Sequence, residues 1–346
     1  MVTMYKAPLM SEILSKGITT MTKMKTIKIW FVDFWCDFNP YDNFFTKLLS
    51  PHYAITFDDK HPDYLFYSVF GGEHFKYKNS IKIYFTGEND VPNFNYADYA
   101  MGFHHITIED RYMRFPLYLL DHYAWNYLEE LSYKRITPEM AQRKFCNFVY
   151  SNNNGADPIR DYFFHELSKY KTVDSGGGHL NNIGGRVADK KEFIRDYKFT
   201  IAFENSSVCG YTTEKLVEPM IVNSLPIYWG NKYVDRDCNT AAILWLKNKS
   251  DVEELIKEII RLDKDDEAYL QKLSLPWFNS PTIKADWEKK YFQFMDNIFA
   301  KTIEETRRRP STGFVQKMEK EDRRVAPFKG NYYWGKLCGL KERFFK

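Results

Sequence analysis

Residues 197–230 read YKFTIAFENSSVCGYTTEKLVEPMIVNSLPIYWG and join two apolar runs through a turn and a helix signal. The runs at 199–203 and 225–229 are short and rich in β-branched and aromatic residues, as buried strands are. Between them, Thr212 or Thr213 can cap a helix that continues through KLVEPMI, and Gly210 permits a tight turn before it. A strand, a helix and a second strand in this order indicate an α/β sheet.

Similar apolar runs occur on the N-terminal side of this segment and indicate further buried strands. They lie at 26–32, 53–57, 64–70, 81–85, 99–103 and 145–151. We expect a short helix over 41–49, and helical structure from 110 to 141, where the leucine and tryptophan spacing favours one apolar face. The second half then repeats the architecture of the first, with the helical stretch as a bridge. A mixed sheet with hairpins stays open for the first half.

Length and composition limit the class of protein. The chain has 346 residues, of which 44% are apolar and 27% charged, so it is long enough for two domains and too apolar for a disordered chain. A net charge of +3 does not favour a nucleic-acid partner. The sequence shows no apolar run of membrane-span length, no signal-peptide core near the N-terminus, and five widely spaced cysteines that fit free thiols. We therefore expect a cytoplasmic protein.

The C-terminal residues differ in charge from the rest of the chain. Residues 301–346 hold 13 Lys and Arg against 6 Asp and Glu, whereas residues 1–300 hold 36 against 40. Basic residues mixed with Trp, Tyr and Phe, as in NYYWGKLCGLKERFFK, suit peripheral contact with an anionic membrane, here its inner face. A partly disordered basic tail and a helix packed on the body are the other interpretations. We divide the chain into domains at 1–142 and 143–300 and a basic aromatic tail at 301–346.

Polar residues that follow the apolar runs are candidates for a binding site, because ligands of open α/β sheets bind at the carboxyl ends of the strands. Such residues occur at 86–89, 152–160, 204–207 and 210–215. The last of these runs combines a capped helix start with Lys215, which suits an anion and in particular a diphosphate. Taken alone, this run fits an ordinary capped helix with solvent-facing Glu and Lys side chains better.

Three segments together resemble one protein family. Residues 197–230 resemble the signature of the α-1,3/4-fucosyltransferases of glycosyltransferase family 10. TGEN at 86–89, followed by NFNYADYAMGF, resembles the acceptor-side segment of the bacterial, Helicobacter-type members, and SNNNGADPIRDYF at 151–163 resembles the segment that precedes their donor-site arginine. The resemblance covers most of residues 26–300. It implies a GT-B fold, in which two Rossmann-like domains face each other across a cleft.

The resemblance also implies a reaction and its partners. Members of this family transfer L-fucose from GDP-fucose to N-acetylglucosamine in lactosamine-type glycans, and they invert the anomeric carbon. For this chain the implied acceptor is the 3-hydroxyl of that sugar in Lewis x-type oligosaccharides of surface polysaccharide. Two alternatives are a GT-B enzyme that uses another nucleotide sugar and a non-catalytic module that binds glycans or membranes.

Individual residues take their roles from the same resemblance. Five positions match those that hold the nucleotide sugar, namely Arg160, Asn205, Tyr211, Glu214 and Lys215. Glu88 matches the family's proposed general base, and such a base typically contributes about 100-fold to 10,000-fold in rate. Glu204 is the second candidate for the base and could instead bind the fucose or the ribose. For either glutamate considered alone, a surface or capping carboxylate is the simpler interpretation.

An acidic pattern and a set of aromatic residues also invite a functional interpretation. Asp235 and Asp237 form a DxD pattern, but no apolar strand directly precedes it, so we assign no metal and no cofactor beyond the co-substrate GDP-fucose. Stimulation by Mn²⁺ would not need a fixed site. Trp30, Trp35 or Tyr84 could stack on an acceptor sugar, and the sequence does not choose among them.

The three consecutive glycines at 176–178, together with residues 181–185, form a glycine-rich segment. They lack the GK[ST] that follows the glycines of a phosphate-binding P-loop. We therefore interpret them as a hinge, or as a loop that passes near the donor.

Overall fold

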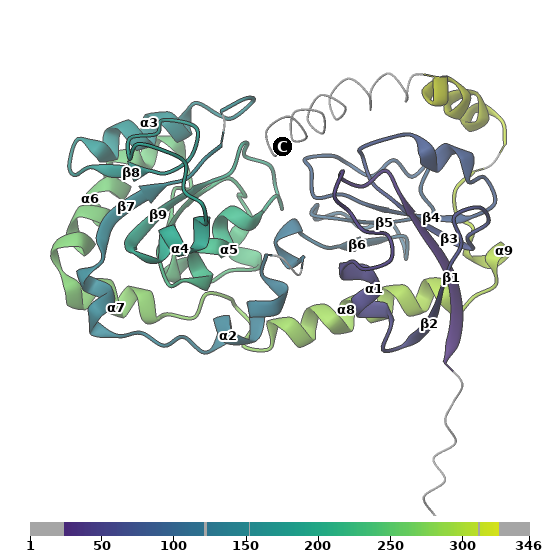
Figure 1. Ribbon diagram of the computed structural model, residues 1–346, viewed down its shortest axis with the longest axis horizontal. Helices are drawn as coiled ribbons and strands as arrows, with labels where there is room; N and C mark the ends of the chain where they lie inside the picture. The colour runs from purple at the N-terminus through teal and green to yellow at the C-terminus, as the bar shows by residue number, and fades with distance from the viewer. Residues whose placement is uncertain (1–23, 121–122, 152, 311, 325–346) are drawn as a thin grey trace, which may run out of the picture.

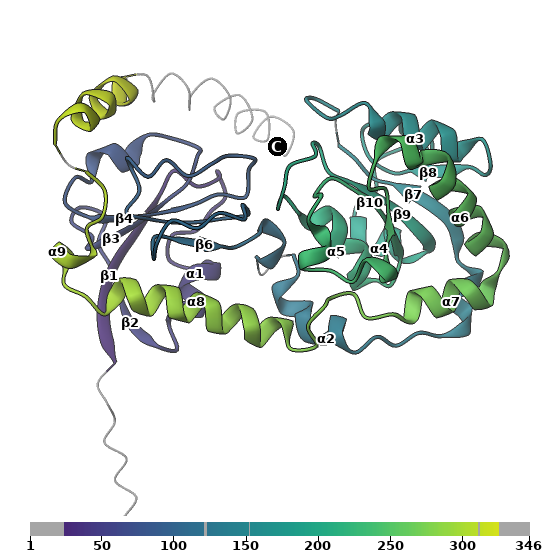
Figure 2. The same cartoon turned by 180° about the vertical axis from the view of Figure 1, so that it is seen from behind.

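The computed structural model describes residues 24–120, 123–151, 153–310 and 312–324 of the chain. Two β-sheets lie side by side, one in each half of the molecule, and helices pack around them (Figures 1 and 2). All strand pairs within the two sheets are parallel. The predicted α/β fold of GT-B type is confirmed, and the alternative of a mixed sheet with hairpins is not adopted in the described residues.

The first sheet has six strands in the order β2-β1-β3-β4-β5-β6. β3, β4 and β5 are buried along their whole length, as parallel strands are when both faces of the sheet are covered. The helix α1 (Phe44–Leu49) packs against β2. The strand bounds are β1 Lys25–Val32, β2 Tyr53–Phe57, β3 Tyr64–Tyr67, β4 Ile81–Phe85, β5 Tyr99–Gly102 and β6 Tyr112–Arg114.

The second sheet has five strands in the order β11-β10-β9-β7-β8. Its strands are β7 Lys144–Phe148, β8 Val173–Ser175, β9 Tyr197–Phe203, β10 Leu225–Trp229 and β11 Leu244–Trp245. Its helices are α3 Ile159–Ser168, α4 Lys190–Arg195, α5 Glu214–Ile221, α6 Val252–Lys264 and α7 Asp266–Ser274. Because β8 lies on one side of β7 and β9 on the other, the order of the strands reverses at β7. Loops diverge at such a reversal and leave a crevice at the carboxyl ends of the strands.

The prediction of a helix from 110 to 141 is wrong. The described residues of this region form β6, three 3₁₀ turns and one five-residue helix, α2 (Leu128–Ser132). Pro116 is extended, with φ −64° and ψ 149°, and proline has no N–H group with which to continue a helix. Apolar residues at helical spacing, such as Leu120 and Leu131, are buried although no single helix carries them.

Strand predictions succeed where the strands are long and fail where they are short. The expected runs at 53–57, 81–85 and 225–229 coincide with β2, β4 and β10. The sequence does not predict β6, β8 or β11, each of which has three residues or fewer. Such short runs have no periodicity to detect, and pairing with a longer neighbouring strand stabilises them.

The helix α8 (Ile283–Phe299) carries the chain from the second half back to the first (Figures 1 and 2). Phe299 at its end packs edge-on against Tyr53 and Tyr64, with ring centroids 5.2 and 4.6 Å apart. Trp287 nearer its start faces the guanidinium of Arg114, with 5.9 Å between the guanidinium carbon and the ring centroid. The end of the long helix is therefore anchored in the core beneath the first sheet.

The first part of the predicted basic tail binds to the first half of the molecule. After α9 (Ile303–Thr306), Arg309 forms an ion pair with Asp98, and both side chains are buried. Arg308 lies 2.5 Å from Asp110, and residues 314–324 are helical. Up to residue 324 the described chain thus follows the interpretation of a segment packed on the body. NYYWGKLCGLKERFFK lies outside the described residues, so membrane contact through it stays a prediction.

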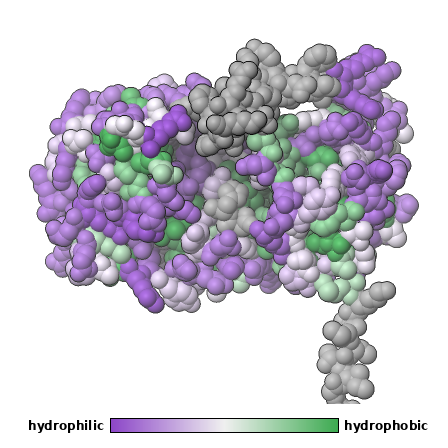
Figure 3. Space-filling model, in the orientation of Figure 1, coloured by the Kyte–Doolittle hydropathy of each residue, from purple (hydrophilic) through white to green (hydrophobic). Residues whose placement is uncertain are grey.

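The surface of the molecule is mixed rather than uniformly polar. The face shown in Figure 3 is predominantly hydrophilic, and its apolar side chains gather in small separate patches. No helix within the described ranges is both long and apolar enough to cross a membrane.

Candidate active site between the two sheets

A cavity of about 360 Å³ lies at the carboxyl ends of β7, β8 and β9, where the strand order reverses. Its walls carry four cationic side chains, those of Arg160, Arg186, Lys190 and Lys215. Tyr150, Asn205, Glu214 and the glycines at 176–178 complete much of the remaining wall. The structure thus brings four of the five predicted donor-binding residues to one cavity, whereas Tyr211 is not part of its wall.

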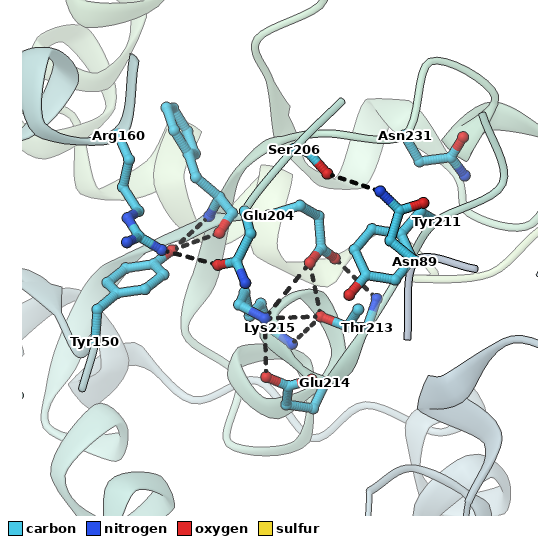
Figure 4. A network of polar contacts seen from close by, with 12 residues as sticks. Asn89, Tyr150, Arg160, Glu204, Ser206, Tyr211, Thr213, Glu214, Lys215 and Asn231 are labelled. Carbon is cyan, nitrogen blue, oxygen red and sulfur yellow. Dashed lines mark hydrogen bonds and ion pairs between the residues drawn. The ribbon is translucent and has the colours of Figure 1, made fainter. Parts of the chain in front are cut away.

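Arg160 is held at this cavity by neighbours that are themselves fixed (Figure 4). Its guanidinium lies 4.2 Å from the ring centroid of Tyr150, and its Nη1 donates a hydrogen bond to Oδ1 of Asn205 at 3.1 Å. The Tyr150 hydroxyl donates to the carbonyl of Phe203 at 2.9 Å and accepts from the Phe203 N–H at 2.7 Å. The ring beneath the guanidinium therefore cannot shift without breaking hydrogen bonds of β9, so the cation is preorganised for an anion.

Lys215 lies in the first turn of α5 between two carboxylates (Figure 4). Its Nζ is 3.1 Å from Oε1 of Glu214 and 3.6 Å from Oε2 of Glu204. Burial by itself would lower the pKa of Lys215, but the charges of Glu204 and Glu214 raise this pKa above its usual value. Burial likewise opposes the ionisation of Glu214, yet the neighbouring Lys215 lowers the pKa of that carboxyl. The ammonium group therefore stays charged at the wall of the cavity.

Glu204 is fully buried, and both of its carboxylate oxygens are occupied. Oε1 accepts the backbone N–H of Thr213 at 2.8 Å, and Oε2 accepts the Thr213 hydroxyl at 2.7 Å. Burial raises the pKa of Glu204, while the charge of Lys215 acts in the opposite direction. Thr213 is also the N-cap of α5, which confirms the predicted helix start. These contacts make Glu204 a residue that holds the beginning of α5 and, through it, Lys215.

Glu88 follows β4 in the first half and reaches solvent. Its backbone N–H donates to the Thr86 hydroxyl at 2.9 Å, and the neighbouring Asn89 side chain donates to the Ser206 hydroxyl of the second half at 3.3 Å. The protein packed around the Glu88 carboxylate raises its pKa, and the charge of Lys215 partly offsets this effect. Glu88 therefore lies within electrostatic range of Lys215, although the two residues come from different sheets.

Tyr211 lies where the two halves touch. It is buried, and its ring packs against Phe103 with the centroids 4.9 Å apart. Asn231, which sequence reasoning did not select, organises the same turn, because its Oδ1 accepts the Gly210 N–H at 2.7 Å and its Nδ2 donates to the Thr212 hydroxyl at 3.0 Å. The sequence could have indicated Asn231, because it is a polar residue shortly after the apolar run that forms the buried strand β10.

The glycine cluster brings the chain close to the donor-side residues. A Cβ on Gly177 would lie 2.0 Å from the carbonyl oxygen of Tyr150, and one on Gly178 would lie 2.3 Å from Nη2 of Arg186. Only glycine fits these two positions without displacing a neighbour. The prediction that this loop passes near the donor residues is consistent with its place in the cavity wall. Arg186 itself has no sequence signal, because no apolar run or helix cap precedes it.

The three aromatic candidates for sugar stacking occupy different environments. Tyr84 is buried inside the first sheet, and Trp30 packs against Tyr41 with ring centroids 5.6 Å apart. Trp35 is half-buried in the loop that follows β1. Because the sheet is parallel, this loop and Glu88 after β4 lie at the same edge. Trp35 is thus the one of the three that lies beyond the strands at this edge, where its ring packs edge-on against Phe34 and Phe38.

The DxD pattern has an ionic partner. Asp237 accepts hydrogen bonds from Nη1 and Nη2 of Arg114, at 2.9 and 2.6 Å. Within the described residues there is no group of three or more His, Cys, Asp or Glu side chains that could hold a metal ion. In the structure, Asp237 is thus part of a salt bridge.

Two family models match the chain, and together they cover most of it. The model described as alpha-(1,3)-fucosyltransferase FucT N-terminal domain matches residues 29–121. The model described as glycosyltransferase family 10 (fucosyltransferase) C-term matches residues 139–321. The first match contains Glu88 and the second contains all five predicted donor positions.

Known proteins similar to the chain include enzymes from distant organisms. An alpha-(1,3)-fucosyltransferase FucT of Helicobacter pylori is 32% identical over 281 residues, which are 71% of this chain and 58% of that protein. GDP-fucose protein O-fucosyltransferase 3 of Homo sapiens is 32% identical over 167 residues, which are 43% of this chain and 35% of that protein. The chain therefore spans less than two thirds of the length of either relative.

Solved structures of similar sequence share the fold. A crystal structure of an alpha1,3-fucosyltransferase with GDP-fucose has a TM-score of 0.66 at 27% identity and covers 80% of this chain and 92% of its own. A crystal structure of an alpha1,3-fucosyltransferase has a TM-score of 0.71 at 27% identity, over 85% and 95% of the two chains. The arrangement of two facing sheets is therefore shared with these proteins.

Proposed function

The chain belongs to glycosyltransferase family 10, the fucosyltransferases, and from this premise we propose that it is an inverting α-1,3-fucosyltransferase. The donor is GDP-fucose, and the acceptor is the 3-hydroxyl of N-acetylglucosamine in lactosamine-type glycans. One observation carries the proposal, a cation-lined cavity on the second sheet beside the contact through which Asn89, the neighbour of Glu88, reaches Ser206 of the second half. The GDP-fucose in a similar crystal structure and the name of the Helicobacter pylori relative support the donor and the linkage.

The donor half of the site is built to stabilise a leaving diphosphate. Arg160 lines the cavity with a guanidinium fixed by its hydrogen bond to Asn205 and would supply positive charge to the phosphates, and Lys215 adds a second fixed positive charge. Asn205 and Glu214 lie beside these cations in the cavity wall and would position the nucleotide sugar, and Tyr211, which is not part of the wall, would contribute from the turn before α5. When the bond between the fucosyl C1 and the diphosphate breaks, negative charge grows on GDP. A well-placed donor to such charge is typically worth about 3 to 4 kcal/mol.

The acceptor half supplies the base. The acceptor oxygen attacks C1 from the face opposite the diphosphate, its proton passes to a carboxylate oxygen of Glu88, and GDP leaves with the electrons of the broken C–O bond. The raised pKa makes Glu88 a better proton acceptor than an ordinary surface glutamate, provided that it is ionised at the working pH. Glu204 is less suited to this role because Thr213 occupies both of its oxygens and no part of it is exposed.

Product analysis with defined acceptors tests the proposal. The purified protein is incubated with GDP-fucose and N-acetyllactosamine, and the product is examined by mass spectrometry and by the NMR coupling of its anomeric proton. We expect a trisaccharide with α-linked fucose on the 3-hydroxyl of N-acetylglucosamine. Absence of product at every acceptor concentration, with GDP bound normally, would contradict the acceptor assignment.

Two further experiments distinguish the proposal from another GT-B transferase and from a non-catalytic module. Titration calorimetry against GDP-fucose, GDP-mannose and UDP-galactose tests the donor, and preference for a UDP-sugar would favour a different GT-B transferase. A peptide or folded protein acceptor tests the activity that the name of the human relative describes. Absence of affinity for any nucleotide sugar would leave the non-catalytic module as the explanation.

A further inference from the structure

Arg114 and Asp237 form an ion pair that joins the two halves of the molecule. Arg114 ends β6 of the first sheet, and Asp237 lies in the segment between β10 and β11 of the second. The pair is bidentate, with Nη1 to Oδ1 at 2.9 Å and Nη2 to Oδ2 at 2.6 Å. Parallel hydrogen bonds of this kind fix orientation as well as distance. The contact therefore restricts rotation of one half relative to the other.

This pair is sheltered from solvent, unlike most ion pairs on the molecule. The exposed fractions of the two side chains are 14% for Arg114 and 10% for Asp237. Trp287 of α8 faces the guanidinium, so a third element closes over the pair. A sheltered pair is screened less by salt than an exposed one, and loss of one partner leaves a charge without compensation.

The guanidinium of Arg114 also contacts the backbone of Phe103, which packs against Tyr211 of the second half. Its Nε donates to the carbonyl oxygen of Phe103 at 3.0 Å, and the Phe103 ring packs against Tyr211. A Cβ on Gly210 would lie only 2.3 Å from that carbonyl oxygen, and Gly210 has a φ of +87°, which favours glycine. The two backbones therefore meet directly beside Tyr211, and Arg114 holds one of them in place.

We propose that Arg114 and Asp237 are positioning residues, which fix the relative placement of the two sheets and so align Glu88 with the donor cavity. Neither residue lines that cavity, whose wall consists of residues from the second half alone. The catalytic consequence rests on the proposed transferase activity, whereas the geometric role does not. In this proposal, Asp237 of the DxD pattern connects the two halves of the molecule and does not bind a metal.

A purely stabilising role makes a different prediction from a positioning role. GDP binding needs only the second half, so its affinity should survive loss of the pair. Transfer needs both halves in register, and a small misplacement of reacting groups costs about 10- to 100-fold in rate. A positioning role therefore predicts a fall in kcat without a matching loss of GDP affinity. A merely structural role predicts a lower melting temperature with unchanged kcat in the folded fraction.

The variants Arg114→Lys and Asp237→Asn keep the volume of each side chain nearly constant. Arg261→Gln is the matched control, because Arg261 forms a bidentate pair with Glu258 within the single helix α6. For each protein we would measure kcat and KM for transfer, the Kd for GDP, and the melting temperature. We expect both variants to lose about 10- to 100-fold in kcat while the Kd for GDP and the control stay unchanged.

A distance measurement tests the geometry independently of activity. Spin labels are placed at the exposed residues Lys76 and Glu254, one in each half, after the cysteines at 36, 209 and 338 are replaced by serine. The wild type should give one narrow distance distribution and both variants a broader one, even if no transfer reaction is found. Unchanged distributions would overturn the proposal, as would a fall in kcat that follows an equal loss of GDP affinity.

Discussion

Glu88 and Glu204 occupy similar places in the two halves of the molecule, since each follows a fully buried strand at the carboxyl edge of its sheet. Protein packed around each carboxylate raises the pKa of both, although Glu204 is fully buried and Glu88 is exposed. Glu204 has both oxygens engaged by Thr213, whereas the Glu88 carboxylate reaches solvent and has no hydrogen-bond partner among the described residues. Glu204, whose oxygens accept hydrogen bonds from Thr213, therefore holds the start of α5 in place. Glu88 lacks such donors, so its carboxylate is available to accept a proton.

The two halves of the molecule differ in the same way as the two glutamates, because the candidate side chains of the second half have more fixed partners than those of the first. In the second half, Asn205 holds the guanidinium of Arg160, and Glu204 lies beside the ammonium group of Lys215. These two cations are therefore already in place for the proposed nucleotide. The first half presents an accessible glutamate and a half-buried tryptophan. More of the candidate side chains are therefore fixed by hydrogen bonds and ion pairs in the second half than in the first.

The largest effect should follow loss of a donor-side cation. Arg160→Ala removes a guanidinium that is stacked on Tyr150 and bonded to Asn205. We expect transfer to fall by about 100- to 1,000-fold, with weaker GDP binding, because the leaving diphosphate loses its preorganised charge. Steady-state kinetics and calorimetry measure both. Arg195→Ala, which removes an exposed pair with Glu192, is the control, and equal losses in the two variants would contradict the assignment.

Removing the charge of Glu204 should damage stability more than chemistry. Glu204→Gln leaves Lys215 without the buried one of its two carboxylate partners and disturbs the cap of α5. Breaking a buried pair typically costs about 3 to 5 kcal/mol, so the free energy of unfolding in urea should fall by about this amount. Glu192→Gln should cost under about 1 kcal/mol because its pair is exposed. Full stability combined with lost turnover would make Glu204 the base instead.

A pH profile separates the two glutamates without relying on stability. The pKa of Glu88 is raised above its ordinary value of 4.5, and the proposed base must be ionised. As the pH falls through this raised pKa, kcat/KM should therefore decline, with a midpoint above 4.5. Glu88→Gln should abolish this decline of kcat/KM at low pH. If the decline persists in the variant, it belongs to the titration of another group.

The smallest effect concerns the acceptor. Trp35→Leu should raise KM for the acceptor by about 2- to 10-fold and leave the Kd for GDP unchanged, because the ring belongs to the first half. Trp30→Leu is the matched control, since Trp30 lies within β1 rather than in the loop that follows it. Equal effects of the two substitutions would indicate general loosening of the first half.

Much of the fold could be predicted because most of its strands are apolar runs of four or more residues. β2, β4 and β10 coincide with runs that the sequence marks, and Thr213 caps α5 as expected. The region from 110 to 141 was misassigned since its apolar spacing imitates a helix, while Pro116 and the pairing of β6 decide the outcome. Tertiary pairing overrides local pattern in such segments.

The candidate site was predictable where its residues follow strands and hidden where it depends on distant contacts. Glu88, Asn205 and Lys215 come after apolar runs and match a known family. The engagement of Glu204 by Thr213 is invisible in the sequence, which left Glu204 open as a second base. The bond between Arg114 and Asp237 joins residues 123 positions apart, and no local signal connects them.

Transfer by Glu88→Gln in a single turnover tests the central claim most directly. The wild type and the variant are each saturated with GDP-fucose and mixed with N-acetyllactosamine, and product formation is followed by rapid quench alongside the Kd for GDP. The account predicts an unchanged Kd and a transfer rate that is about 100- to 10,000-fold lower in the variant. A rate equal to that of the wild type would contradict the assignment of the base to the first half of the molecule.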